Sequence, residues 1–210
     1  MAALTLEQQL EELSEELHIE SKHHEKMRSL LEQLRNYHLP TYEHSIRVSL
    51  TSSKIARHMH LNTRPTLYGG VLHDVGKLEI PFEILNKTQG FSEEDMGIMK
   101  SHVQKGYEML MKEGYVFSAW LALTHHYYQK NSYPLVLPEK PEMFSHGTSL
   151  LVDVYARIVS IADHNDALKR RNDKFGPAEL KKAQAREIML MTNPDQRYLI
   201  EYLYNEGVLT

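Results

Sequence analysis

The sequence contains no cysteine among its 210 residues. Disulfide bonds, thiolate nucleophiles and zinc sites built on cysteine are therefore excluded. No run of eighteen or more apolar residues occurs, and the first residues lack the apolar segment of a signal peptide. The sequence thus predicts neither a transmembrane helix nor secretion. A reducing cytoplasm is the compartment that we expect for such a chain.

An excess of basic residues is also missing, since the formal net charge is −4. A general nucleic-acid-binding surface needs a surplus of lysine and arginine. We therefore expect neither an extended nucleic acid nor a membrane as partner. A small anionic substrate would have to be held by a few local cations or by metal ions.

Short alternating runs of β-branched residues are almost absent, whereas apolar residues recur with the helical period along the whole chain. The sequence therefore predicts an all-α fold of roughly seven to nine helices. A leucine stripe over residues 6–34 is interpreted as a helical hairpin packed on the core, and a homodimer seam is the alternative. We expect an N-terminal helical extension at 1–38 and the main domain at 39–210.

Several helix ends can be predicted from capping residues. Two pairs have the spacing of a reciprocal capping box, namely Thr5 with Gln8 and Ser92 with Asp95. Thr41, which follows Pro40, is predicted to cap the next helix. Gly76 is predicted to end a later helix in the left-handed conformation that glycine adopts easily.

Histidine is abundant, with thirteen in the chain, and some histidines stand beside an aspartate or another histidine. A single helical histidine is more often a surface or core residue than a metal ligand, so only an ordered set is informative. Helical bundles build metal sites from inward-facing side chains on several helices. The candidates in chain order are His44, His73, Asp74, His102, His125, His126 and Asp163.

Two divalent cations about 3.5–4 Å apart can clamp a phosphate and turn a bridging water into hydroxide. Asp74 is the candidate for a shared ligand, because adjacent helical residues diverge by about 100° and can address different ions. The sequence leaves open which histidine of the 125–126 pair is a ligand. The predicted sets are His44, His73, Asp74 and Asp163 for one ion, and Asp74, His102 and one of His125 and His126 for the other.

Further residues are candidates for supporting roles. Asp166 lies one helical turn after the last candidate ligand and is expected to support a ligand rather than to bind metal. Lys77 could stabilise charge on phosphate oxygens as catalysis proceeds. Tyr127, Tyr128 and Tyr133 could stack on a base of the substrate. Arg170 and Arg171 could meet a substrate phosphate, and solvated arginines are the alternative.

The order of these residues, together with "HDVGKLEIPFEILNKTQGFSEEDMGIMKSHVQKGYEML" and "ARIVSIADHNDAL", resembles the HD superfamily of metal-dependent phosphohydrolases. Within it the chain is most similar to the HD-GYP branch, whose members hydrolyse cyclic di-GMP. The resemblance spans roughly residues 40–205 and implies an HD-domain helical bundle with a di-metal centre on the candidate ligands. It also implies that His126 is a ligand or a substrate contact and that Lys77 binds phosphate. Iron or manganese is the expected metal, with zinc or nickel as alternatives.

The sequence departs from the HD-GYP pattern at three positions. Tyr127 and Ser132 stand where the branch has a glutamate and a glycine, and this segment is shorter by one residue. Pro40 stands where members with three metals have a glutamate, which favours two metals here. We therefore predict slow or no cleavage of cyclic di-GMP, and better cleavage of linear dinucleotides or smaller phosphodiesters.

The predicted function is a phosphohydrolase that cleaves a phosphodiester or a nucleotide with a bridging hydroxide. One alternative is a di-iron oxygenase, because some HD-superfamily proteins use the same ligands for oxygen chemistry. The other is a non-catalytic nucleotide-binding signalling module, which the altered segment 125–134 would permit.

Overall fold

The computed structural model describes residues 3–19, 21–87, 89–129, 131–169 and 182–210. All regular elements in these ranges are helical, so the predicted all-α fold is confirmed. The elements are α1 (Leu6–Glu16), α2 (Ser21–Tyr37), α3 (Leu39–His58), α4 (Arg64–Leu72), the 3-10 helix η1 (Val75–Glu79), α5 (Phe82–Leu85), α6 (Glu93–Lys100), α7 (His102–Lys112), α8 (Val116–Thr124), α9 (His146–Lys169), α10 (Lys182–Thr192), the 3-10 helix η2 (Pro194–Gln196) and α11 (Arg197–Asn205). No helix in the described part of the chain has the length and apolar character needed to span a bilayer.

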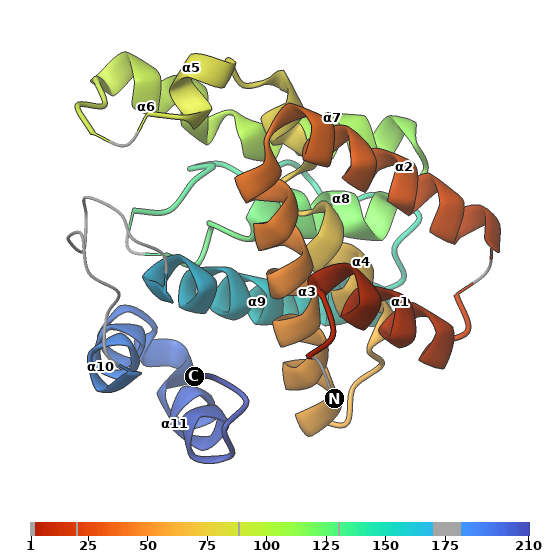
Figure 1. Cartoon of the computed structure of the whole chain (residues 1–210), viewed down its shortest axis with the longest axis vertical. Helices are drawn as coiled ribbons and strands as arrows, with labels where there is room; N and C mark the ends of the chain where they lie inside the picture. The colour runs from red at the N-terminus through yellow and green to blue at the C-terminus, as the bar shows by residue number, and fades with distance from the viewer. Residues whose placement is uncertain (1–2, 20, 88, 130, 170–181) are drawn as a thin grey trace.

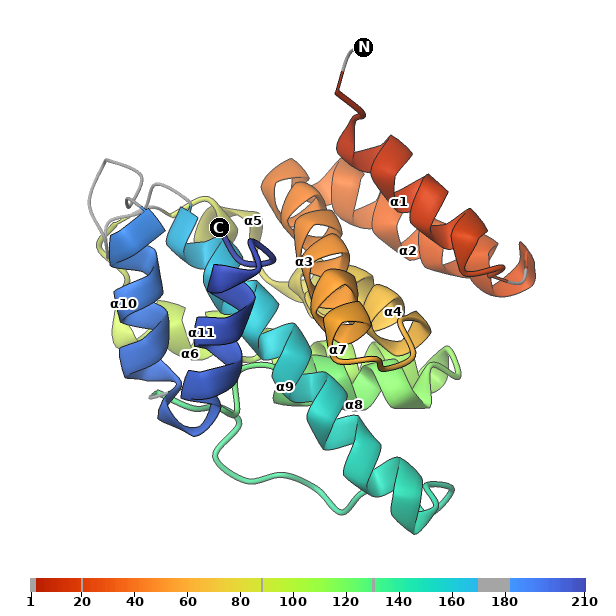
Figure 2. The same ribbon diagram turned by 90° about the horizontal axis from the view of Figure 1, so that it is seen from below.

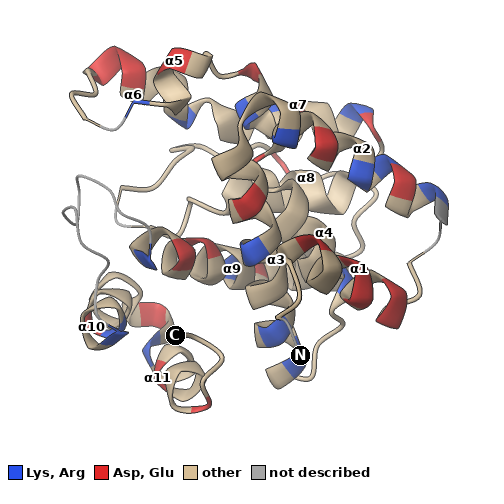
Figure 3. Ribbon diagram, in the orientation of Figure 1, with Lys and Arg blue, Asp and Glu red and all other residues tan. Residues whose placement is uncertain are grey.

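Helices α3 and α9 pack against each other in the middle of the bundle. The α1–α2 hairpin and α4 lie on one side of this pair, and α10 and α11 lie on the other (Figures 1 and 2). Charged residues of both signs are interspersed along the helices, with acidic residues gathered on α1 (Figure 3). The central position of α3 and α9 matters for the site, because each carries candidate ligands.

Two clusters of buried apolar side chains stabilise this arrangement. One joins α9 to α3, α8 and the C-terminal helices, and it includes Ile55, Trp120, Ile158, Met189 and Leu203. The other joins the hairpin to α3, α4 and α7, and it includes Leu30, Leu34, Ile46, Leu72 and Leu110. Each large side chain buried in this way contributes about 1.5–3 kcal/mol relative to exposure. The clusters therefore hold the helices around the candidate site in fixed relative positions.

The N-terminal hairpin packs directly on the main bundle. Its buried leucines pack against the bundle, and hydrogen bonds add to this contact. The Tyr37 hydroxyl donates to the carbonyl oxygen of Ile80 at 2.7 Å. The Arg64 guanidinium donates two hydrogen bonds to the carbonyl oxygen of Leu17, at 2.9 and 2.7 Å. The leucine stripe thus faces the core of its own chain. A domain division at residue 38 and a homodimer both stay predictions.

The predicted helix ends are right at two places and wrong at two others. Both capping boxes form, at the starts of α1 and α6. The prediction for Thr41 is wrong, because α3 begins earlier and His38 caps it, its Nδ1 accepting from the Thr41 N–H at 3.3 Å. Pro40 sits inside the first turn, where the missing N–H of proline has no cost.

Gly76 is the second correction. It does not adopt a positive φ, and the chain continues from α4 into η1 instead of ending there. A Cβ atom at this position would lie 2.0 Å from the His102 carbonyl oxygen and 2.4 Å from the Gly106 nitrogen. Glycine is therefore needed at this position because two backbones approach each other closely. This approach brings η1 against the start of α7.

Gly70 has a similar role on the other side of α4. A Cβ atom there would lie 2.3 Å from the Cα atom of Ser49 on α3. The absence of a side chain lets α4 pack directly on α3. The two glycines therefore position the end of α4, where His73 and Asp74 stand, between α3 and α7.

Candidate metal centre

The structure brings all seven candidate ligands to one place inside the bundle. They come from α3, the end of α4, the start of α7, the end of α8 and the middle of α9. Six are buried and His126 is partly buried: His44, His73, Asp74, His102, His125 and Asp163 are each at most 5% exposed. Burying so many polar groups costs free energy unless each finds a partner or a cation. Their gathering therefore indicates a functional site.

The first group of donor atoms surrounds one oxygen of Asp74. The Nε2 atoms of His44 and His73 lie 3.3 Å apart, and each lies 3.5 Å from Asp74 Oδ2. Asp163 Oδ1 lies 3.1 Å from the Nε2 of His44. Metal bonds of about 2.0–2.2 Å place neighbouring ligand atoms about 3–3.5 Å apart. These four donors therefore have the spacing of ligands around one ion.

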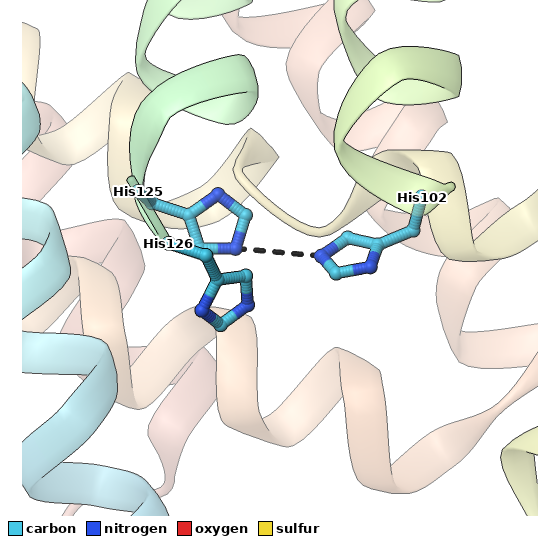
Figure 4. A group of neighbouring side chains, drawn as sticks. All are labelled: His102, His125 and His126. Atoms are coloured by element: carbon cyan, nitrogen blue, oxygen red, sulfur yellow. Dashed lines mark hydrogen bonds between the residues drawn. The ribbon is translucent and has the colours of Figure 1, made fainter. Parts of the chain in front are cut away.

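The second group surrounds the other oxygen of the same carboxylate. His102 Nε2 lies 3.3 Å from Asp74 Oδ1. It also lies 3.4 Å from the Nε2 of His125, a contact that Figure 4 draws as a dashed line. The Nε2 of His125 lies 3.9 Å from Asp74 Oδ1. His126 lies beside this pair, and one ring nitrogen of each of the three histidines falls within a 4.8 Å group (Figure 4). Both histidines of the 125–126 pair thus face the site.

The Nδ1 hydrogen bonds determine which nitrogen of each ring is available. In three rings Nδ1 lies 2.7–2.8 Å from a carbonyl oxygen three residues earlier in the chain: His73 with Gly70, His102 with Met99 and His125 with Ala122. In His44 the Nδ1 partner is Asp166 Oδ2, at 2.7 Å. Because these oxygens only accept, Nδ1 carries the proton and Nε2 of the neutral ring presents a lone pair. Metal-binding histidines have this arrangement.

Electrostatics keep the imidazoles neutral and the carboxylates charged. Burial lowers the pKa of His102 and His126 to about 3. Burial alone raises the pKa of Asp74, but the Lys77 ammonium group beside it holds this pKa well below the usual range. The pKa of Asp163 is also held well below its usual range, because the polar ring atoms of His44 and of the neighbouring histidines outweigh the effect of burial. This is the protonation state in which both residue types bind cations.

Three observations test whether the donors fit metal ions. Neutral rings whose Nε2 lone pairs face each other at 3.3–3.4 Å have no proton to share between them. The buried atoms Asp74 Oδ1 and His126 Nδ1 make no hydrogen bond with any described residue. The two groups of donor atoms described above share the Asp74 carboxylate. A cation in each group would satisfy all of these atoms, so the residues present fit two divalent ions.

The candidates for substrate contact lie next to these groups. Lys77 Nζ is 2.6 Å from Asp74 Oδ2. The Tyr133 ring stacks on His126 with a centroid distance of 4.5 Å, and Lys100 Nζ lies 5.5 Å from the Tyr133 centroid. Arg170 and Arg171 lie outside the described residues. Their predicted role in substrate binding therefore stays a prediction.

Asp166 lies beside His44, where the sequence predicts a supporting residue. Its second partner, Arg47, was not predicted from the sequence. Arg47 on α3 forms two hydrogen bonds with the Asp166 carboxylate. The signal was present, because Arg47 follows His44 by three residues, the same spacing that separates Asp163 and Asp166. Nothing in the sequence shows, however, that the two helices face each other.

Several known proteins are similar to this chain. A cyclic di-GMP phosphodiesterase of Thermotoga maritima is 30% identical over 162 residues, which cover 73% of this chain and 41% of that protein. The cyclic di-GMP phosphodiesterase response regulator RpfG of Xanthomonas campestris is 37% identical over 101 residues, which cover 46% of this chain and 24% of that protein. The matched residues thus make up less than half of the length of each of these relatives.

The fold is also that of a solved structure. The HD domain of the Listeria monocytogenes phosphodiesterase PgpH, in complex with cyclic di-AMP, matches with a TM-score of 0.55 and 22% identity over 85% of each chain. The family model described as HD domain matches residues 41–168, which hold all the candidate ligands. The predicted resemblance to the HD superfamily is confirmed, and the chain belongs to the HD domain family.

Proposed function

We propose that this chain is a metal-dependent phosphodiesterase with a di-metal centre. One observation carries the proposal: the two oxygens of Asp74 face two separate groups of imidazole nitrogens. A carboxylate in this position is suited to be shared between two cations. The similarity to proteins named as cyclic dinucleotide phosphodiesterases supports the same function.

The ligand assignment follows the two groups. We assign His44, His73, Asp74 and Asp163 to one ion, and Asp74, His102 and His125 to the other, with His126 as a further ligand or a substrate contact. When bound, two such ions would supply positive charge to a phosphate and lower the pKa of a water molecule between them. We propose iron or manganese, because imidazole and carboxylate ligands suit both, with zinc or nickel as alternatives.

The remaining roles fall to residues beside the metal ligands. Lys77 is the cation next to the shared carboxylate, and we assign it to the phosphate oxygens of the substrate. The Tyr133 ring, stacked on His126, offers an aromatic face on which a base could stack. A small phosphodiester or nucleotide is therefore the proposed substrate class, and a cytoplasmic location stays a prediction.

The test is a substrate panel with the metal-loaded chain. Purified protein is loaded with manganese, or with ferrous iron under anaerobic conditions, and metal content is measured. It is then assayed with cyclic di-GMP, cyclic di-AMP, a linear dinucleotide and bis(p-nitrophenyl) phosphate, with Asp74→Asn as the matched control. Cleavage by the wild type alone supports the proposal. Two bound ions without cleavage of any phosphoester would contradict it, and oxygen consumption by the iron form would then favour the oxygenase alternative.

A further inference from the structure

Arg47 on α3 makes a two-point contact with a buried carboxylate on α9. Its Nε donates to Asp166 Oδ1 at 2.7 Å, and its Nη2 donates to Asp166 Oδ2 at 3.2 Å. The Asp166 side chain is 8% exposed and that of Arg47 is 32% exposed. This fork-shaped pairing is the strong geometry for an arginine and a carboxylate, because both N–H groups lie in one plane.

The Asp166 carboxylate also contacts a candidate metal ligand. Asp166 Oδ2 accepts a hydrogen bond from His44 Nδ1 at 2.7 Å. At the other side of the same ring, His44 Nε2 lies 3.1 Å from Asp163 Oδ1 in the first donor group. A continuous chain of contacts therefore runs from the Arg47 guanidinium to a nitrogen that faces the metal site.

His44 differs in this respect from the other imidazoles. His73, His102 and His125 are oriented by backbone carbonyl groups one turn earlier, and helical backbone leaves these carbonyls little freedom. His44 instead depends on a side chain from another helix, and a carboxylate can rotate about its own bonds. Something must hold that carboxylate at the correct angle. Arg47 is the described residue whose contact covers both of its oxygens.

We propose that Arg47 is a positioning residue for the metal centre, which holds Asp166 so that His44 presents Nε2 to the first ion. The inference rests on the proposed di-metal function. Loss of the arginine would remove the contact that spans both oxygens of this nearly buried carboxylate, and the carboxylate could then rotate away from the angle that suits His44. Lysine would keep the charge but could not form the planar two-point contact. Partners of this kind are typically worth 10- to 100-fold in metal affinity.

The experiment compares manganese binding to the full chain and to variants, by equilibrium titration of chelator-treated protein. Arg47→Met should weaken one ion by about 10- to 100-fold and leave the other unchanged, and Arg47→Lys should fall between this variant and the wild type. Arg57→Met is the matched control, because Arg57 stands on the same helix and pairs with Glu16 at the surface, 3.0 Å away. It should bind both ions as the wild type does.

A double-mutant cycle tests whether Arg47 acts through Asp166. In an Asp166→Asn background, Arg47→Met should add less than about threefold, because the two residues form one unit. Full additivity, or equal weakening of both ions with a lower melting temperature of the metal-free protein, would overturn the proposal. If Arg47→Met does not fold, Arg47→Lys and the cycle built on it decide the question.

Failure of this inference is distinguishable from failure of the proposed function. Metal binding is measured without substrate, so the titrations remain informative if the wild type binds two ions but cleaves nothing. If the wild type cleaves a phosphodiester and Arg47→Met retains both ions at full affinity, only the role of Arg47 is wrong.

Discussion

Lys77 Nζ lies 2.6 Å from Asp74 Oδ2, the same oxygen that faces the Nε2 atoms of His44 and His73 at 3.5 Å. The ammonium group therefore neutralises part of the charge on the shared carboxylate and helps to keep its pKa low. Because the side chain is only 18% exposed, the cation is confined to the site. A substrate phosphate would meet this cation beside the metal ligands.

We predict that Lys77→Ala lowers kcat by about 100-fold or more while both metal ions remain bound. The physical reason is that Lys77 binds no metal but would stabilise charge on the phosphate. Steady-state kinetics and metal analysis of the same preparation check this. Lys105→Ala is the matched control, because Lys105 pairs with Glu79 near the surface, 3.7 Å away. Wild-type turnover in Lys77→Ala would show that Lys77 is only a structural partner of Asp74.

Removal of the shared carboxylate should release both ions. We expect Asp74→Ala to retain less than one metal per chain after dialysis, because each donor group loses an anionic ligand. Asp163→Ala is the comparison, since Asp163 Oδ1 belongs to the first group, and this variant should lose one ion and keep the other. Elemental analysis measures both. Full occupancy in Asp74→Ala would reject the shared-ligand assignment.

A methyl group at Gly76 should separate η1 from α7. The added Cβ would meet the His102 carbonyl oxygen at 2.0 Å, so we expect Gly76→Ala to cost at least about 1–3 kcal/mol of unfolding free energy. Gly97→Ala is the matched control, because nothing lies within 4 Å of its Cβ position on α6. Alanine there should be neutral or stabilising by up to about 1 kcal/mol. Urea unfolding compares them, and equal stability would contradict the close approach.

The metal-free protein should lose stability in mild acid. Burial holds the pKa of His102 and His126 at about 3, whereas an unfolded histidine titrates near pH 6.5. Between these values the unfolded chain binds more protons, so lowering the pH favours unfolding. We expect the free energy of unfolding, measured with urea and a chelator, to fall as the pH drops from about 6.5 toward 3. His102→Gln should show a shallower fall, and a flat profile from about pH 7 to 5 would contradict the prediction.

The segment after the paired histidines should reduce cleavage of cyclic di-GMP. Tyr133 forms an aromatic wall on His126, while Tyr127, in place of a glutamate, is 40% exposed. We expect slow or no cleavage of cyclic di-GMP, and faster turnover of linear dinucleotides or aryl phosphodiesters. Side-by-side assays with manganese and with anaerobic ferrous iron measure this. If cyclic di-GMP is the best substrate with both metals, the interpretation of residues 125–134 is wrong.

The features that depend on neighbouring residues were readable from the sequence. The helical period of apolar residues predicted the all-α fold, and the capping boxes at Thr5 and Ser92 predicted two helix starts. These features involve residues within one or two helical turns, so their separation along the chain fixes their separation in space. The ordered histidines and aspartates likewise predicted which side chains gather, because few such residues fall on inward helix faces.

Contacts between distant segments were decided only by the tertiary structure. The sequence predicted a left-handed helix end at Gly76, whereas the fold requires glycine there because the backbone of α7 passes too close for a side chain. The sequence predicted that Asp166 supports a ligand. It did not predict that Arg47 binds Asp166, because the two residues are 119 positions apart in the chain. The division of the ligands around the two oxygens of Asp74 depends on the angles at which α3, α4, α7, α8 and α9 pack. Those angles follow from side-chain volumes throughout both cores, which no local pattern encodes.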